Sequence, residues 1–357
     1  MKQRLIDLIT VEGPLSVAQY MTLCLHDPTD GYYAAHAALG ATGDFITAPE
    51  VSQMFGEMIG LWAASLWLQM GRPQPVRLVE MGPGTGALMS DLLRAGRAVP
   101  GFVEAVDLWL VEPSAPLRAL QAERLDSAAP RFVDRLEDVA GGAPIILVAN
   151  EVLDCLPVRQ FVHHSGAWLE QRIGLGADGE LAFGLAPAPN GLAAPDHPPE
   201  GAVLEVSSAQ QALGQMIGER IAAQGGAALL VDYGRGEPGY GDTFQAVSGH
   251  ARVDPLAEPG LADLTVHADF PSVAAAARAT GAQVAGVVSQ GAFLMALGLA
   301  ERARALQAAQ PDAASLIARQ MARLVDEDQM GRLFKVLSVH SPGLSPPGFA
   351  PPLGEMS

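Results

Sequence analysis

The hydrophobic positions of this chain change their spacing near residue 76. Over residues 1–72 apolar residues recur at helical spacing, and an apolar-rich helix is expected over Ser52–Met70. Further along, short apolar runs end in turn residues and helical patterns separate the early ones, the runs lying at 76–80, 108–111, 145–149 and 227–231. Buried runs separated by helices are typical of a parallel sheet covered on both faces, so the pattern predicts an α/β fold.

The connection between the runs at 145–149 and 227–231 is long. It holds alternating, hairpin-like segments over Gln160–Leu175 and Leu181–Leu185, followed by a stretch rich in proline and alanine. We therefore expect an N-terminal helical region (1–72), a sheet domain (73–340) with an insertion at about 156–225 after its fourth strand, and a flexible proline-rich tail (341–357). In the sheet domain, further helices are expected at 272–280 and near 300–327, and further strands at 284–288 and 333–339.

Composition and charge narrow the classes of partner. Of the 357 residues 49% are apolar and 17% charged, which is typical of a folded globular protein. With 22 Lys and Arg against 39 Asp and Glu, the net charge is −17. Such a surface repels phosphate backbones and anionic lipids, and the longest apolar stretch, 59–68, is too short to span a bilayer. We expect no nucleic-acid partner and no membrane insertion, whereas a basic protein segment would be attracted.

The cysteines and the N-terminus bear on metal binding and compartment. Cys24 and Cys155 lie far apart and form neither a disulfide framework nor a thiolate metal site, and no HExxH motif or Asp-rich loop occurs, so no metal is expected. The N-terminus continues directly into a helical pattern, without a signal peptide or an Arg/Ser-rich transit segment. This pattern predicts a bacterial-type, cytoplasmic protein.

The clearest local motif lies at the end of the first apolar run, where EMGPGTG at residues 80–86 leads into a helix. Glycines in such a turn permit positive φ angles and close approach of a ligand, and the helix N-terminus offers free N–H groups. The GxGxG spacing of Gly82, Gly84 and Gly86 differs from the GxGxxG of dinucleotide folds, and Glu80 would repel a pyrophosphate. A carboxylate here suits a ligand with an ammonium and a sulfonium group, which describes S-adenosylmethionine.

Two further carboxylates follow the next strands. Glu112, after the run at 108–111, can accept hydrogen bonds from both hydroxyls of a ribose, and Asp138, after the third-strand region, can accept one from the adenine amino group. Together with Glu80 they match the three polar parts of one ligand in order. Taken singly, Glu112 or Asp138 is equally consistent with a helix N-cap or a solvated turn.

Longer motifs extend over nearly the whole chain: GDFITAPEVSQMFGE at 43–57, the glycine motif at 80–86, ANEVLDCLP at 149–157, VDYG at 231–234, DTFQA at 242–246, DLTVHADF at 263–270, QGAFL at 290–294 and LFKVL at 333–337. In this order they resemble the MidA-like family of class I S-adenosylmethionine-dependent methyltransferases. The mitochondrial members of that family are arginine methyltransferases involved in assembling respiratory complex I. The resemblance implies a Rossmann-like class I fold with a mostly parallel seven-stranded sheet, S-adenosylmethionine as cofactor and a protein arginine as methyl acceptor.

An arginine acceptor makes definite demands on the site. Its delocalised charge makes it a poor nucleophile, and paired carboxylates can bind two of its nitrogens and leave the third free to react. Glu151 and Asp154, at the carboxyl end of the fourth strand and three residues apart, are the expected catalytic pair. Asn150 is expected to join the cofactor-binding residues, and the residues expected to bind substrate are Asp44, Glu50 and Asp232. Alternatively, Asn150 and Asp154 satisfy backbone N–H groups of the turn, and Glu50 caps the helix that follows it.

Other functions stay open at this stage. A methyltransferase of the same fold can act on a small molecule or on another residue type. An assembly factor can bind S-adenosylmethionine yet act mainly through protein contacts, and a homodimer is compatible with either activity. An NAD(P)-dependent oxidoreductase is disfavoured by Glu80 and by the glycine spacing.

Overall fold

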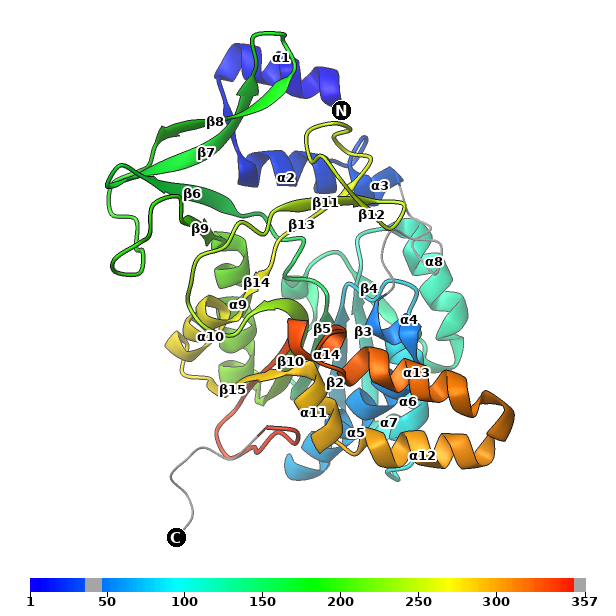
Figure 1. Ribbon diagram of the computed structural model, residues 1–357. Coiled ribbons are helices and arrows are strands. Elements are labelled where there is room, and N and C mark those ends of the chain that lie inside the picture. Colours follow the sequence, from blue (N-terminus) through cyan, green and yellow to red (C-terminus); the bar gives the residue numbers. More distant parts are fainter. Residues whose placement is uncertain (36–46, 350–357) are drawn as a thin grey trace.

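The computed structural model describes residues 1–35 and 47–349. A twisted central sheet runs through the molecule (Figure 1), with strands in the order β15 (Gln283–Ser289), β16 (Phe334–His340), β10 (Gly226–Arg235), β5 (Ile145–Asn150), β2 (Val76–Met81), β3 (Val106–Val111) and β4 (Arg131–Val133). Neighbours pair in parallel except around β16, which is antiparallel to β10 and β15, and the short β14 (Ala268–Asp269) pairs in parallel with β10. The predicted mostly parallel, seven-stranded α/β sheet is confirmed, with β14 as an eighth, marginal strand.

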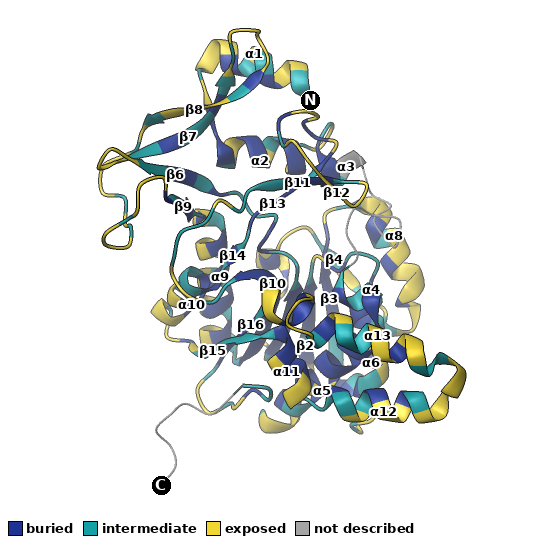
Figure 2. Cartoon of the chain, in the orientation of Figure 1, coloured by how far each residue is buried: buried dark blue, intermediate teal, exposed yellow. Residues whose placement is uncertain are grey.

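Alternate residues of these strands face two separate hydrophobic cores. On one face, Leu78 and Ile146 pack with residues of α5 (Gln53–Gln69) and α6 (Ala87–Gly96). On the other, Val79 and Leu147 pack with residues of α9 (Ser208–Gln224) and α10 (Phe270–Ala279). Because helices cover both faces, the central strands β2, β5, β10 and β16 are mostly buried, as the dark blue centre of Figure 2 shows, and their sequences are largely apolar runs. The edge strands β15 and β4 are only partly buried.

Two boundaries differ from those expected from the sequence. Helix α5, expected within the N-terminal region 1–72, lies in the same hydrophobic core as β2. Helix α9, expected within the insertion at about 156–225, packs against α10 and covers the sheet. The reason is that an apolar face predicts that a helix is buried but does not specify which element it packs against. In the structure the sheet domain includes α4 (Ala48–Val51) and α5, and the inserted part ends before α9.

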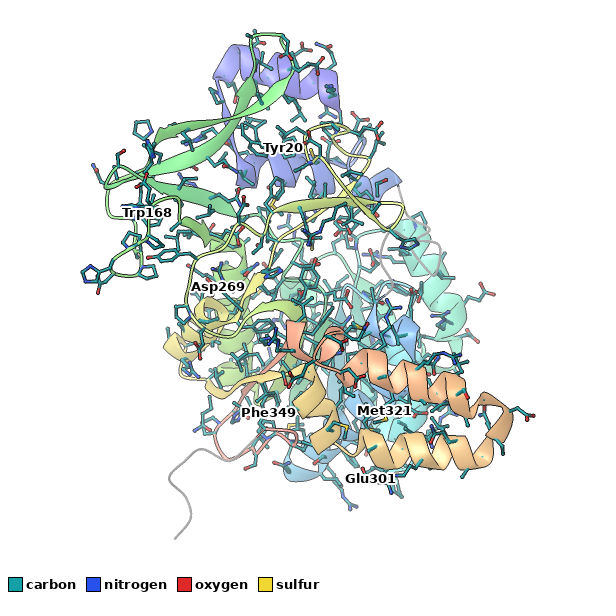
Figure 3. All side chains as sticks on the ribbon, in the orientation of Figure 1. Tyr20, Trp168, Asp269, Glu301, Met321 and Phe349 are labelled. Carbon is teal, nitrogen blue, oxygen red and sulfur yellow. The ribbon has the colours of Figure 1, made fainter. Side chains whose placement is uncertain are left out.

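A second unit lies over the carboxyl ends of the central strands (Figure 1) and is assembled from three distant segments. These are the N-terminal elements α1 (Lys2–Glu12), β1 (Leu15–Ser16), α2 (Val17–His26) and α3 (Tyr32–Ala35), the inserted strands β6 (Arg159–His164), β7 (Ala167–Leu175), β8 (Leu181–Pro187) and β9 (Val203–Val206), and the small sheet of β11 (Gln245–Ser248), β12 (Ala251–Val253) and β13 (Asp263–Thr265). Strand β1 pairs with β7, and Tyr20 of α2 (Figure 3) donates a hydrogen bond from its hydroxyl to the carbonyl oxygen of Pro255 at 2.5 Å. These contacts hold the three segments together in one layer.

The segment between β15 and β16 is entirely helical. It contains α11 (Gln290–Ala296), α12 (Leu299–Ala309), α13 (Ala314–Val325) and α14 (Met330–Leu333). The single helix expected near 300–327 is therefore a pair, because Pro311 begins a separate turn between α12 and α13 and cannot continue a helix. Two further short helices are α7 (Phe102–Ala105) and α8 (Ala115–Arg124).

Residues 341–349 of the expected flexible tail lie on the protein surface. The ring of Phe349 packs on that of Phe293, with 5.4 Å between the centroids, and the backbone N–H of Ser345 donates to Gln69 Oε1 at 2.8 Å. Residues 350–357 lie outside the described part of the chain. In the described part, no helix combines the length and apolar character needed to cross a membrane.

Candidate functional site

The glycine motif forms a tight turn at the end of β2, where a cavity opens. Gly82, Gly84 and Gly86 all have positive φ angles, of 60°, 52° and 76°, a region that side chains with a Cβ rarely adopt. A Cβ at Gly82 would lie 3.1 Å from the Val152 side chain, whereas one at Gly84 would meet no atom within 4 Å. Gly86 begins α6. The loop therefore leaves open space above Gly84, beside the first turn of a helix.

Glu80 is buried under this loop without a hydrogen-bond partner for one of its oxygens. Its side chain is 2% exposed and lines the cavity, and Oε2 has no partner among the described residues. Burial alone raises the pKa of Glu80 well above its usual value. A buried carboxyl oxygen without a partner normally belongs to a site that another molecule completes.

The other two predicted cofactor carboxylates occupy different positions. Glu112 is buried just after β3; its oxygens accept hydrogen bonds from the Ser114 backbone N–H at 2.8 Å and from Gln121 Nε2 at 3.4 Å. Gln121 also donates to the carbonyl oxygen of Gly84 at 2.7 Å, so Glu112 is connected to the glycine loop without lining the cavity. Asp138 is exposed and lies outside the cavity lining. Their contacts with ribose and adenine stay predictions.

The fourth strand, β5, ends in a strained residue that points an acid into the cavity. Glu151 has a φ of 54°, unusual for a residue with a side chain, and its N–H donates to the carbonyl oxygen of Val231 at 2.8 Å. Its Oε1 accepts from Asn150 Nδ2 at 3.0 Å and from the Ala48 N–H at 3.3 Å. Burial, together with the charge of Asp154, raises the pKa of Glu151 to about 8.

Asp154 lines the same cavity as Glu151 and Asn150. It is buried, and burial raises its pKa to about 6 even though the Tyr233 hydroxyl acts in the opposite direction. The Oδ1 of Asn150 is buried and has no partner among the described residues. The structure thus brings together the three polar residues expected at the end of this strand, and Asn150 keeps a free acceptor facing the site.

Asp232 has a different environment from that expected of a substrate ligand. It is fully buried and does not line the cavity. Its Oδ2 accepts the backbone N–H groups of Leu153, at 2.8 Å, and Asp154, at 3.1 Å, and its Oδ1 accepts that of Tyr233 at 2.8 Å. Burial, with Asp154 and Glu151 nearby, raises its pKa well above the usual range. In this structure Asp232 fixes the turn that carries Asp154.

Glu50, on α4, also lines the cavity. Its Oε1 accepts a hydrogen bond from Thr85 Oγ1 at 3.4 Å, and the same hydroxyl accepts one from Arg124 Nη1 at 2.8 Å. The side chain of Ser52, rather than Glu50, caps the following helix by accepting from the Met54 N–H. Asp44, the remaining predicted substrate residue, lies outside the described residues.

Three lining residues were missed by the strand-end argument: Tyr32, Tyr33 and Asp263. The two tyrosines come from α3, with ring centroids 5.5 Å apart in an edge-on arrangement, and Asp263 begins β13. All three belong to the unit that lies over the strand ends, so no rule about parallel sheets locates them. Asp263 begins the motif at 263–270, but the position of all three residues over the cavity depends on how that unit packs.

The electrostatic character of the cavity is one-sided. Five carboxyl groups line it, and the described lining residues include no Lys, Arg or His; the acids are Glu50, Glu80, Glu151, Asp154 and Asp263. In the described residues no cluster of three or more His, Cys, Asp or Glu has the arrangement of a metal site. A cavity of this charge is suited to organic cations.

Comparison with known proteins decides the family. A family model described as S-adenosyl-L-methionine-dependent methyltransferase matches residues 58–288. The chain belongs to this methyltransferase family. The methyltransferase is 34% identical to the mitochondrial protein arginine methyltransferase NDUFAF7 of Danio rerio, over 94% of this chain and 86% of the relative. It is 35% identical to the homolog of Drosophila melanogaster, over 92% and 82% respectively.

A solved structure agrees with this assignment. A superfamily member from Burkholderia thailandensis, bound to S-adenosyl-homocysteine, matches with a TM-score of 0.82 and 27% identity, over 97% of this methyltransferase and 93% of that chain. The cofactor of the methyltransferase is S-adenosyl-L-methionine, as predicted from Glu80 and the glycine spacing. The residues present fit it: a buried carboxyl oxygen of Glu80 lacks a partner, and the space above Gly84 is open.

The predicted cytoplasmic localisation is contradicted by the relatives, which are named mitochondrial proteins. The prediction rested on the helical pattern at the N-terminus. In the structure that pattern is α1, whose Leu5 and Ile9 are buried in the core of the second unit. The N-terminal helix of the methyltransferase is thus a part of the fold and carries no information about compartment.

Proposed function

We propose that this methyltransferase transfers a methyl group to a guanidinium nitrogen of an arginine in a protein. The proposal rests on the charge of the cavity lining. Five carboxyl groups line the cavity, and none of the described lining residues has a basic side chain. The cofactor brings a sulfonium and an ammonium, and a guanidinium adds a further cation, so both cofactor and acceptor place positive groups against these acids. The relatives named protein arginine methyltransferase support the same assignment.

On the cofactor side, we assign Glu80, Asn150 and the glycines at 82, 84 and 86 to S-adenosylmethionine, which supplies an electrophilic methyl group when bound. The unpartnered oxygens of Glu80 and Asn150 are acceptors for its donors, and the loop glycines allow its backbone contacts. Glu112 and Asp138 keep their proposed roles at the ribose and the adenine.

On the acceptor side, Glu151 and Asp154 bind the guanidinium. Two carboxylates can accept hydrogen bonds from two of its nitrogens and so orient the third toward the methyl group. Burial without a counter-ion raises the pKa of Glu151 to about 8 and that of Asp154 to about 6. A guanidinium between them would lower both pKa values and favour the charged forms. The ionised carboxylate of Glu151 can then accept the proton that the methylated nitrogen releases.

The remaining predicted substrate residues take supporting positions in this scheme. Glu50 adds negative charge to the cavity lining. Asp232 is a positioning residue, because its carboxylate holds the backbone of the Leu153–Asp154 turn. Asp44 keeps its proposed role in substrate binding. As the acceptor protein we propose a subunit of respiratory NADH dehydrogenase (complex I), the acceptor class that the family resemblance implies.

The test is transfer of label from tritiated S-adenosylmethionine to the proteins of an extract from cells that lack this methyltransferase. After acid hydrolysis we expect tritiated methylarginine with the wild-type protein and about 10²- to 10³-fold slower labelling with Glu151→Gln, which preserves the shape of the side chain. Label in another amino acid or in a small molecule would refute arginine methylation. Cofactor binding by calorimetry without any transfer would instead identify an assembly factor that acts through protein contacts.

A further inference from the structure

A second cleft lies beside the cavity, between the start of α5 and the helical pair α12–α13. Its walls are formed by residues 50–53 on one side and by residues of α12, α13 and the turn between them on the other. The pair is inserted between β15 and β16, which are adjacent strands in the sheet, and its outer face is exposed in Figure 2. Figure 3 marks the two helices by Glu301 on α12 and Met321 on α13.

The cleft adjoins the proposed catalytic cavity at Glu50. This side chain lines both hollows, and its Oε1 accepts the Thr85 hydroxyl of the glycine loop. On the same short helix, the Ala48 N–H donates to Glu151. The cleft therefore begins at α4, the helix that contacts Glu151 of the proposed guanidinium-binding pair. A polypeptide whose arginine occupies the cavity has this cleft as an adjoining surface.

The chemistry of the cleft suits a neutral stretch of polypeptide. Leu316 is 49% exposed on its floor although Ile317, the next residue, is buried in the core. The side-chain amides of Gln53, Gln310 and Gln320 line it and form no hydrogen bond with the described part of the chain. Amides can donate to and accept from a peptide backbone, and Glu50 is the sole ionisable group among the described lining residues.

We propose that this cleft binds the polypeptide of the methyl acceptor next to its reactive arginine. The inference rests on the proposed arginine methylation and adds the surface that selects the acceptor. Leu316 contacts an apolar side chain of that segment, and the three glutamines bind its backbone. In this arrangement the α12–α13 pair serves substrate recognition.

The experiment measures the rate at which the Leu316→Asp variant forms methylarginine at increasing concentrations of the same extract. The matched control is Leu185→Asp. Leu185, on β8, is 51% exposed and lines neither the cavity nor the cleft. At limiting extract we expect Leu316→Asp to form methylarginine about tenfold more slowly than the control, because it loses a central interface contact. At high extract the difference in rate should be smaller. Calorimetry should show the same affinity for S-adenosylmethionine in both variants.

The outcomes separate the two proposals. Equal rates for Leu316→Asp and Leu185→Asp at limiting extract, within about twofold, would overturn the acceptor cleft while arginine methylation stands. A loss of cofactor affinity in Leu316→Asp would also count against it, because the effect would then be on the fold. Absence of methylarginine with the wild-type protein would refute the proposed function itself, and the cleft assignment with it.

Discussion

Glu151 shows at the scale of one residue how the site is built. A left-handed φ in a residue with a side chain costs about 1–3 kcal/mol and persists where surrounding contacts impose it. Here the backbone bond to Val231 and the contacts with Asn150 and Ala48 hold the residue. The conformation directs the carboxylate into the cavity, where burial and the neighbouring Asp154 make it unusually basic. Strain and basicity at the same residue are typical of functional sites.

This basicity predicts a pH dependence of methyl transfer. The ionised form of Glu151 binds the guanidinium, so kcat/KM of the wild-type protein should rise with pH up to about 8, the pKa of Glu151 before the acceptor binds. Glu151→Gln should lower the rate by about 10²- to 10³-fold and remove this limb, while calorimetry shows unchanged cofactor affinity. A limb near pH 8 that persists in the variant would show that another group titrates.

Glu80 supports a separate prediction about the cofactor. Replacing it by Gln keeps the volume but removes the negative charge under the glycine loop, so calorimetry should show at least about tenfold weaker binding of S-adenosylmethionine. Asp138→Asn tests the adenine contact in the same titration. If Glu80→Gln binds the cofactor like the wild-type protein, the buried oxygen serves another purpose.

At the scale of elements, the close packing of α5 against α6 depends on two glycines. A Cβ at Gly56 would lie 2.6 Å from the Asp91 Cβ, and one at Gly60 would lie 2.5 Å from the carbonyl oxygen of Leu92. Real Cβ atoms do not come this near to such neighbours. Glycine at these two positions therefore allows the two helix backbones to approach more closely than any other residue would. Helix α6 begins at the glycine loop, and this packing therefore helps to position the cofactor site.

Gly60→Ala should consequently destabilise the protein, even though alanine favours an exposed helix by about 1 kcal/mol. Because the clash is with backbone, the helices must move apart, and we expect a net loss of about 2 kcal/mol in the free energy of unfolding, measured with urea. Gly184→Ala on β8 is the control, since its Cβ would meet nothing within 4 Å and its φ is not positive. Equal stability of Gly60→Ala and the wild-type protein would show that α5 and α6 are free to shift.

At the scale of the whole molecule, buried acids from separate segments gather at one end of the sheet. Burial is the largest cause that raises the pKa values of Glu80, Glu151, Asp154 and Asp232 in the cofactor-free protein. For an acid whose pKa is higher in the folded state, the folded state binds protons more tightly than the unfolded chain. Its contribution to stability is complete below the unfolded pKa and is lost as pH rises toward the folded pKa.

The cofactor-free protein should therefore lose stability as pH rises from about 5 to about 8. This range lies above the unfolded pKa of a carboxyl, about 4, and extends to the folded pKa of Glu151. Urea denaturation at both pH values measures this loss, and it should be smaller in Glu151→Gln. Glu301→Gln, on the exposed Arg304 pair, is the control and should behave like the wild-type protein. If Glu151→Gln loses as much stability between these pH values as the wild-type protein, the raised pKa assigned to buried Glu151 is wrong.

Much of this molecule follows from residue spacing. Continuous apolar runs predicted the covered parallel sheet, and glycines after β2 predicted the ligand turn. Because the carboxyl ends of parallel strands meet at one edge, Glu80, Asn150, Glu151 and Asp154 were expected together, and the structure places all four in one cavity. These inferences depend only on local geometry and on the rule that parallel strands present the same end.

Other features were decided by tertiary structure. The sequence by itself determined the sheet, the cofactor turn and the acids at the strand ends. Only packing placed Tyr32, Tyr33 and Asp263 over them and packed α5 and α9 against the sheet. Packing also buried Asp232 outside the cavity lining, where backbone N–H groups are its partners. The physical reason is that periodicity specifies which face of an element is buried, whereas its partner depends on shape and contact between segments distant in the chain.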